Sequence, residues 1–390
     1  MASPIPFVVY SDGPRLPTGL ARITRDLVSR LWLEHEALGI DLLQVGYDPL
    51  PGPAVPWPLH SAARIDTEGD WGAGLVDNAW LGYFGPQRGG VLFSVWDPGR
   101  AYALLGCKGP EQRWGYFPVD ATNVNGTLGG PAAECLQRYD RVLAYGRWGS
   151  EVLRGLRSGP VPYLPHGVDL DTFTYVQTQE SLARVEQVIQ MREGEILIGC
   201  VATNQPRKDL GLYFATLAEL RSRGLKVRGW LHTDTLVRAW SVQQLVSDFG
   251  LAKRVSVTLT LNDEELAACY SVCGATIAPG LGEGFGYPLV ESLACGTPAV
   301  HVDYAGGAEL VPLNAWRVPA VAERLEGIYA LRRPVMSPVD MANAVMRALE
   351  WKRNDERVCQ AYCRGQVEYL DWKHLWPRFR SWFRKGLEAY

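Results

Sequence analysis

Short apolar runs alternate with longer segments of helical periodicity along the chain, which is typical of βαβ units around a parallel sheet. In the first half, these runs predict strands at 5–10, 40–45, 91–95, 116–119, 141–144 and 161–164. Apolar residues recur at intervals of three or four from Leu20 to Leu31, which predicts a helix over 19–33. The segment 47–90 is rich in Pro, Gly and Trp, so we expect loops and short strands there, around an acceptor site.

A second series of the same kind follows a helical segment at 180–191. Its apolar runs predict strands at 196–201, 227–231, 255–259, 275–278 and 299–302, with helices between them. The pattern therefore predicts two α/β domains, 1–173 and 195–365, joined by a linker over 174–194 and followed by a helix at 366–390. Ligands of such paired domains usually bind in a cleft between them.

The composition is that of an ordinary globular protein with two cores. The chain has 390 residues, of which 47% are hydrophobic and 21% charged, and its net charge is −3. Neither half is basic, which argues against tight, nonspecific binding of nucleic acid. The start of the chain resembles a first strand rather than a signal peptide, and no window of about 20 apolar residues is present. These features favour a cytoplasmic protein without a transmembrane segment.

The eight cysteines do not suggest a disulfide framework. Cys269 and Cys273 are four residues apart in a helical segment, and so are Cys359 and Cys363, which places each pair on one helix face. Structural zinc ligands usually lie in tight loops with two intervening residues. Buried free thiols in a reducing compartment are therefore favoured over a zinc site.

The most informative stretch runs from Ala278 to Val300, where a predicted strand ends in a glycine-rich turn. A helix is expected to follow, with Pro288 in its first turn. Glycines let the backbone approach an anion closely, and a helix N-terminus directs N–H groups at it, so a pyrophosphate fits this geometry. Glu283 and Glu291 add two carboxylates that suit the hydroxyls of a sugar and a ribose. Taken alone, the glycines also fit a tight turn in any α/β protein.

The string Glu-Gly-Phe-Gly-x-Pro-x-x-Glu at 283–291, followed by Ala-Cys-Gly-Thr-Pro at 294–298, closely resembles the donor-site signature of the family-4 retaining glycosyltransferases. Three further stretches resemble the same family, at 11–20, 164–173 and 201–210. The strings Pro-Thr-Gly-Leu-Ala-Arg and Asn-Gln-Pro-Arg-Lys are similar to its compact viral and archaeal branch. A viral origin would place the protein in a host cytoplasm.

The resemblance implies the α/β fold called GT-B, in which two Rossmann-like domains have parallel sheets that face each other across a cleft. The N-terminal domain would bind the acceptor and the C-terminal domain the nucleotide sugar, without a metal ion. The C-terminal helix would cross back to the N-terminal domain.

The resemblance assigns a catalytic role to three residues. Arg207 and Lys208 would neutralise the diphosphate of the donor, and Glu283 would hold sugar hydroxyls near the reacting carbon. Many relatives carry an Arg five residues before the Lys, where this chain has Thr203, so Arg207 would take its place. The expected donor-binding residues are Thr18, Gly19, Gly282, Gly284, Phe285, Gly286 and Glu291.

Several of these residues also fit a purely structural role. Arg207 and Lys208 fit a solvated pair of loop charges. Glu291 fits an acid that complements a helix dipole, and Thr18 fits a helix N-cap without a ligand.

Two further residues are expected to contact the donor or the acceptor, namely His166 and Asp120. A structural hydrogen bond is the alternative for His166. Asp169 and Asp171 are similar to the acid pair that binds a metal in the other major glycosyltransferase fold. They lie in the His-Gly-Val-Asp segment, however, so we interpret them as a turn.

The resemblance implies transfer of a hexose from a nucleotide diphosphate sugar, with a UDP-sugar such as UDP-glucose as co-substrate. Because no second pair of carboxylates suits double displacement, retention is expected through front-face attack, with the departing phosphate taking the acceptor's proton. The acceptor would be a saccharide, a lipid-linked molecule or a small molecule. The oligomeric state is open.

Other functions remain open. Hydroxymethylated pyrimidine DNA is an alternative acceptor, which the resemblance to the viral and archaeal branch suggests. The segment 372–385 carries five Lys and Arg residues and no acid, which suits the phosphates of a nucleic acid or a membrane surface. Packing against the N-terminal domain is the alternative for that segment. A sugar-nucleotide epimerase and a catalytically inactive nucleotide-binding partner protein are the competing classes.

Overall fold

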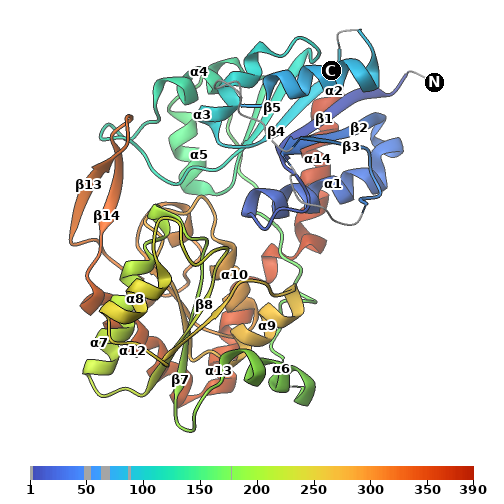
Figure 1. Cartoon of the computed structure of the whole chain (residues 1–390). Coiled ribbons are helices and arrows are strands. Elements are labelled where there is room, and N and C mark those ends of the chain that lie inside the picture. Colours follow the sequence, from blue (N-terminus) through green and yellow to red (C-terminus); the bar gives the residue numbers. More distant parts are fainter. Residues whose placement is uncertain (1–2, 48–53, 63–70, 87–88, 177) are drawn as a thin grey trace. The chain divides into compact units, whose positions relative to one another are not determined.

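The computed structural model describes residues 3–47, 54–62, 71–86, 89–176 and 178–390. The chain divides into two compact units (Figure 1). Unit 1 consists of Met1–Gly167 together with Lys373–Tyr390, and unit 2 of Val168–Trp372. Each unit contains one six-stranded sheet, and helices connect its strands.

The sheet of unit 1 has the strand order β3-β2-β1-β4-β5-β6, and all of its neighbouring strands are parallel. The strands are β1 (Ile5–Asp12), β2 (Ile40–Tyr47), β3 (Leu59–Ala62), β4 (Val91–Val95), β5 (Gln112–Phe117) and β6 (Arg141–Ala144). The helices are α1 (Gly19–Leu38), α2 (Ala73–Phe84), α3 (Pro98–Ala101), α4 (Gly130–Arg138), α5 (Arg147–Arg154) and α14 (Trp372–Leu387). The strand order changes direction between β1 and β4, which is the point where doubly wound sheets bind ligands.

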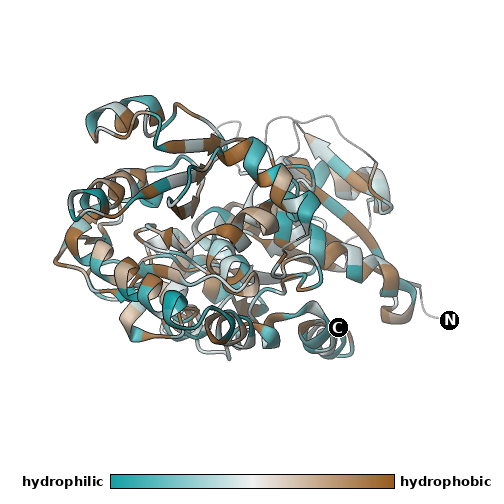
Figure 2. Ribbon diagram, turned by 90° about the horizontal axis from the view of Figure 1, so that it is seen from below, coloured by the Kyte–Doolittle hydropathy of each residue, from teal (hydrophilic) through white to brown (hydrophobic). Residues whose placement is uncertain are grey.

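The central strands of unit 1 are buried on both faces, as expected for a parallel sheet covered by helices. Phe7, Val8, Val9 and Tyr10 of β1 are all fully buried. Figure 2 shows helices that carry both hydrophobic and hydrophilic residues. A continuous apolar run is therefore the sequence signal of such a strand, because neither face meets water.

The C-terminal helix α14 packs onto the sheet of unit 1. Phe383 contacts the rings of Phe7 and Phe93, at centroid distances of 6.0 and 5.2 Å. On the side facing α1, the Trp376 indole donates to a Glu34 oxygen at 2.8 Å, and Arg380 forms an ion pair with the same carboxylate. One face of this basic helix is therefore fixed by apolar and polar contacts within unit 1.

The sheet of unit 2 has the strand order β12-β11-β10-β7-β8-β9 and is also parallel. Its strands are β7 (Ile196–Val201), β8 (Val227–His232), β9 (Val255–Thr258), β10 (Ala275–Ala278), β11 (Ala299–Val302) and β12 (Arg317–Val318). Its helices are α6 (Gln179–Ile189), α7 (Leu210–Ser222), α8 (Val242–Asp248), α9 (Asp263–Val272), α10 (Tyr287–Ala294), α11 (Ala305–Ala308), α12 (Pro338–Asn354) and α13 (Glu356–Gly365). An antiparallel hairpin of β13 (Ala322–Glu326) and β14 (Leu331–Val335) precedes α12.

The α/β fold class predicted from the sequence is confirmed, and five strands have the predicted bounds: β4, β6, β7, β10 and β11. The predicted strand at 161–164 is wrong, because this run, in which Val161 and Leu164 are buried and Tyr163 is exposed, forms only an isolated bridge between Ala144 and Tyr163. The strand predicted at 116–119 is instead β5, which ends before Pro118, a residue that lacks the N–H needed to continue the ladder. The structure describes part of the segment 47–90. In that part, helix α2 lies where the sequence predicted loops.

The described residues include no helix of the length and apolarity needed to cross a bilayer. All eight cysteines are buried free thiols. Cys273 and Cys269 follow helical geometry, with the Cys273 thiol donating to the Cys269 carbonyl at 3.2 Å. The interpretation of the cysteines as buried thiols is therefore confirmed.

Candidate functional site

The first part of the candidate site lies at the carboxyl edge of the sheet of unit 2. Strands β7 and β10 are neighbours in this sheet, so the loops that follow them emerge side by side. The backbone N–H of Leu281, in the loop after β10, donates to the carbonyl of Arg207, in the loop after β7, at 2.7 Å. This bond joins the two segments that the sequence singled out.

Glu283 forms ion pairs with both cations of the loop after β7. Its Oε1 lies 2.5 Å from Lys208 Nζ, and its Oε2 lies 3.3 Å from Arg207 Nη1. The same Arg207 nitrogen donates to the carbonyl of Gly282 at 2.9 Å. Burial alone would raise the pKa of the Glu283 carboxyl, but Lys208 and Arg207 hold it at about 2. Glu283 is therefore a carboxylate at neutral pH and cannot act there as a proton donor.

The backbone around Glu283 requires glycine at three positions. A Cβ on Gly280 would lie 2.5 Å from Glu283 Oε1, and a Cβ on Gly306 would lie 2.6 Å from the carbonyl oxygen of Gly284. Gly286 adopts φ +110° where it precedes α10, a conformation that L side chains rarely adopt. Of the glycines predicted to bind the donor, Gly286 is thus also needed for the turn into α10.

Glu291 lies in α10 and is almost fully buried, with 2% of its surface exposed. The hydroxyl of Tyr270 donates to its Oε2 at 2.9 Å. Phe285 precedes the helix, and its ring contacts that of Tyr287 edge-on, at 5.5 Å between centroids. Pro288 lies in the first turn of α10, as predicted. The assignments of Glu291 to a ribose and of Phe285 to the donor remain predictions.

His301, in β11, was not predicted from the sequence. Its Nδ1 lies 2.7 Å from the carbonyl of Ala278, which can only accept, so Nδ1 carries the hydrogen. Burial lowers the pKa of this imidazole, which is fully enclosed. A Cβ on Gly307 would lie 2.5 Å from His301 Nε2 and 3.0 Å from the Cβ of Glu283, so the neutral ring lies beside Glu283. No motif surrounds His301, and only its place in a strand next to β10 points to the site.

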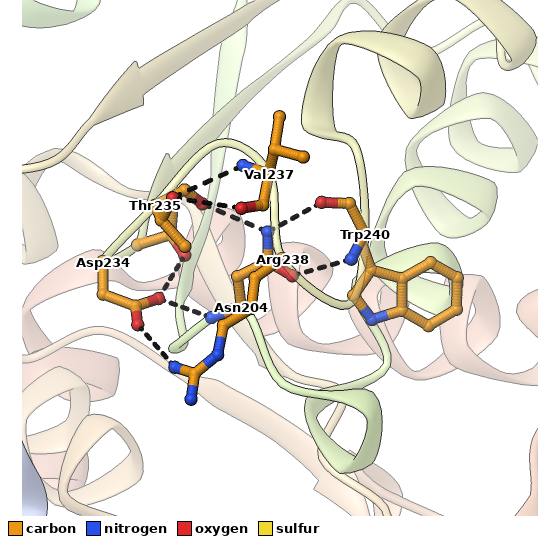
Figure 3. Close-up of polar contacts among 7 residues, drawn as sticks. Asn204, Asp234, Thr235, Val237, Arg238 and Trp240 are labelled. Atoms are coloured by element: carbon orange, nitrogen blue, oxygen red, sulfur yellow. Dashed lines mark hydrogen bonds and ion pairs between the residues drawn. The ribbon is translucent and has the colours of Figure 1, made fainter.

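Asn204 connects the loop after β7 to the loop after β8 (Figure 3). Its fully buried side chain accepts from the N–H of Trp240 at 2.9 Å and donates to the Trp240 carbonyl at 2.8 Å. Its own backbone N–H donates to Asp234 Oδ1 at 2.6 Å, and Arg238 pairs with the other oxygen of that carboxylate. Asn204 therefore holds the start of the segment that carries Arg207.

In unit 1, Thr18 is the N-cap of α1, as predicted. Its Oγ1 accepts from the N–H of Ala21 at 3.1 Å and donates to Asp12 Oδ2 at 2.5 Å. A Cβ on Gly19 would meet no atom within 4 Å, so packing within the chain does not require glycine there. The approach of these residues to a donor phosphate remains a prediction.

His166 is 1% exposed, and its Nδ1 lies 2.7 Å from the hydroxyl of Tyr116. Since that hydroxyl donates to the carbonyl of Leu164 at 2.6 Å, it accepts from Nδ1. Burial lowers the pKa of His166 well below its ordinary value, so the ring is neutral. The structural hydrogen bond considered for His166 is present. Asp120 is partly exposed in the loop after β5.

Asp169 forms a turn, as the sequence indicated. Its Oδ1 accepts from the N–H groups of Asp171 and Thr172, at 3.0 and 3.3 Å, and its Oδ2 accepts from the Thr172 hydroxyl. Within the described part of the chain, no group of three or more His, Cys, Asp and Glu residues is arranged to hold a metal ion.

Comparison with known proteins agrees with this geometry. The family described as "Glycosyl transferases group 1" matches residues 187–317, which contain the loops after β7 and β10. The D-inositol 3-phosphate glycosyltransferase of Nocardiopsis dassonvillei is 26% identical over 264 residues, covering 59% of this chain and 57% of the relative. A GDP-mannose-dependent alpha-(1-6)-phosphatidylinositol monomannoside mannosyltransferase of Mycolicibacterium smegmatis is 28% identical, covering 52% of each protein. The matches therefore span only about half the length of these curated relatives.

Solved structures resemble the whole chain in fold. A sucrose-phosphate synthase from Thermosynechococcus elongatus has a TM-score of 0.72 at 16% identity, covering 99% of this chain and 100% of that one. HepE of Anabaena, in complex with UDP and glucose, has a TM-score of 0.71 at 12% identity, with the same coverage.

Together, these findings show the predicted GT-B fold and a match of residues 187–317 to the glycosyl transferases of group 1. This match agrees with the family-4 resemblance of the sequence. The relatives described above are bacterial, and nothing among these findings supports the compact viral and archaeal branch.

Proposed function

We propose that this chain transfers a hexose from a UDP-sugar to a hydroxyl acceptor, with retention of configuration and without a metal ion. The observation that carries this proposal is the Glu283–Lys208–Arg207 cluster beside the N-terminus of α10. Two cations and a helix N-terminus suit a diphosphate. The ionised carboxylate suits hydroxyls of the sugar that the diphosphate carries.

The proposed reaction uses these groups for positioning and for charge. The acceptor oxygen forms a bond to the anomeric carbon on the face from which the diphosphate departs, and the bond from that carbon to the phosphate oxygen breaks. The acceptor's proton passes to the departing phosphate oxygen. Lys208 and Arg207 stabilise the negative charge on the diphosphate, and Glu283 orients the sugar. His301 supports Glu283 from within the sheet.

The nucleotide and the compartment are parts of the same proposal. HepE, which has this fold, has been solved with UDP-glucose, whereas the mannosyltransferase relative is named for GDP-mannose. We favour UDP as the nucleotide of the donor, and GDP is tested as the alternative. The eight free thiols support a reducing compartment, for which we propose the cytoplasm.

The test is release of UDP from UDP-glucose, compared with release of GDP from GDP-mannose, with and without a panel of acceptors. The panel includes inositol 3-phosphate, because the relatives' names contain it. We expect UDP release that an acceptor stimulates and that Lys208→Met lowers about 100-fold. Lys226→Met removes an exposed cation of unit 2 and is the matched control. Anomeric NMR of the product tests retention, and an inverted linkage would show that this part is wrong.

A second acceptor class is DNA with hydroxymethylated pyrimidines. The exposed residues of α14 include four cations, namely Lys373, Arg378, Arg384 and Lys385. Such a surface suits phosphates of a nucleic acid. UDP release stimulated by modified DNA, and not by plain duplex DNA, would support this acceptor.

The remaining alternatives give other outcomes in the same assay. An epimerase would convert the nucleotide sugar without an acceptor and without releasing UDP. An inactive nucleotide-binding partner protein would be stabilised by UDP but would release none under any condition.

A further inference from the structure

A second group of polar side chains lies at the carboxyl edge of the sheet of unit 1. Asp12 is the last residue of β1, Asp97 follows β4, and Asp120 follows β5. Strands β1, β4 and β5 are consecutive neighbours in the sheet, so these three acids emerge from adjacent positions. We call Asp12, Asp97 and Asp120 the acidic edge.

The charges of the acidic edge influence one another. Burial raises the pKa of the Asp97 carboxyl, and the neighbouring charge of Asp120 raises it further. Burial also raises the pKa of Asp12. Arg100 lowers both values, but its guanidinium lies over the ring of Trp71 at 4.6 Å. The cation that acts on both Asp12 and Asp97 is thus also in contact with an aromatic ring.

Tyr145 adds an observation of a different kind. It follows β6, the next strand of the sheet, and is only 4% exposed, with its ring against His166 at 4.0 Å. Its hydroxyl has no hydrogen-bond partner among the residues that the structure describes. Burial raises the pKa of this phenol, and the charges of Asp12 and Asp97 raise it further. Because β6 follows β5 in the parallel sheet, Tyr145 lies at the same edge of the sheet as the three acids. A buried hydroxyl without a partner is unfavourable unless a ligand supplies one.

Trp96, which follows β4, also has a buried polar atom without a partner among the described residues. This atom is its indole nitrogen. Two residues that follow separate strands at this edge of the sheet therefore have a buried polar atom without a partner in the part of the chain that the structure describes. Their arrangement suits a molecule that offers several hydroxyl groups, each able to donate to a carboxylate and to accept from an O–H or N–H.

We propose that the acidic edge and Tyr145 form the acceptor site, and that this site takes an uncharged, polyhydroxylated acceptor rather than a phosphorylated one. The proposal rests on the proposed function, whose donor site lies in unit 2. The carboxylates accept hydrogen bonds from acceptor hydroxyls, and the Tyr145 hydroxyl bonds to an acceptor oxygen. A phosphate group beside Asp97 and Asp120 would meet two like charges, which disfavours its binding, whereas Asp12 already accepts a hydrogen bond from Thr18.

The first test compares matched acceptors in the UDP-release assay, myo-inositol with inositol 3-phosphate and glucose with glucose 6-phosphate. We expect kcat/KM to be at least about 10-fold higher for the uncharged member of an active pair. Preference for the phosphorylated member overturns the proposal, and so does an enzyme that hydrolyses its donor but responds to no uncharged polyol. Loss of donor hydrolysis and of stabilisation by UDP would instead be a failure of the proposed function.

The second test uses two variants of the site. Asp120→Asn should raise KM for the uncharged acceptor about 10-fold and leave KM for UDP-glucose unchanged. It should also lower the ratio of kcat/KM for the uncharged acceptor to kcat/KM for its phosphorylated counterpart. Tyr145→Phe should also raise KM for the acceptor while leaving Tm unchanged or higher, because its hydroxyl has no partner to lose.

Matched controls in unit 1 are Glu134→Gln, which removes an exposed charge of α4, and Tyr163→Phe, which removes an exposed hydroxyl. Neither control should change KM for the acceptor. A clear fall in Tm for Tyr145→Phe would show that its hydroxyl is bonded within the chain, and unchanged acceptor KM in both site variants would place the acceptor elsewhere. Either result refutes the proposal.

Discussion

Replacing Glu283 by Gln removes the carboxylate on which two loops of unit 2 converge. In the folded chain the pKa of this carboxyl is about 2, against an ordinary value of 4.5. Each tenfold change in an ionisation constant corresponds to about 1.4 kcal/mol, so the ionised carboxylate contributes about 3 kcal/mol to the free energy of unfolding. The side chain is only 11% exposed, so solvent screens the two ion pairs weakly.

The dependence on pH follows from the direction of the shift. Because folding lowers the pKa of Glu283, its contribution is fully present above pH 4.5 and is lost as pH falls from 4.5 toward 2. Wild type and Glu283→Gln should therefore differ by about 3 kcal/mol both at pH 7 and at pH 5.5. The difference should shrink below pH 4.5.

The assay is hydrogen–deuterium exchange of peptides from β10 and α10 in the full chain, over a urea series. It reports on unit 2 directly, which matters because a chain of two units need not unfold in one step. Glu180→Gln removes a carboxylate of an exposed ion pair on α6 and should change the opening free energy far less. A difference below about 1 kcal/mol for Glu283→Gln at pH 7 would refute the ion-pair argument.

Three further predictions follow from the same unit and from the buried histidines. Lys208→Met should lower kcat for UDP release by about 100-fold, because it removes charge stabilisation of the leaving diphosphate, and a change in KM alone would contradict this role. Asn204→Ala should lower the free energy of unfolding by about 2 kcal/mol and weaken stabilisation by UDP, since it breaks the bonds to Trp240, and thermal unfolding with and without UDP checks both effects. The pKa values of His166 and His301 are lowered in the fold, so the unfolded chain takes up protons first and stability should fall as pH drops below about 6.5. A urea midpoint that stays constant from pH 8 to pH 5.5 would contradict that expectation.

Much of the fold could be predicted because its signals are local. Buried strands of a parallel sheet are apolar on both faces, so β7 and β10 stand out as continuous runs with the observed bounds. The N-cap at Thr18 and the glycine-rich turn before α10 are also short-range features. Helix α2 was missed because it follows Gly72, without a capping side chain, in a segment rich in Trp and Gly. The β13–β14 hairpin was missed because β13 has no buried residue and β14 buries only the adjacent Arg333 and Pro334, so neither strand shows an alternation of buried and exposed positions.

The chain's sequence alone determined which strands are buried, where the glycine-rich turn lies and which family it resembles, since each depends on residues close together along the chain. The tertiary structure decided which groups meet. Lys208 and Glu283 are 75 positions apart and pair only because β7 and β10 are neighbours in the sheet. His301 lies beside Glu283, and Tyr145 lies at the same sheet edge as Asp12, Asp97 and Asp120, because strand order sets which residues and loops share one edge of a sheet.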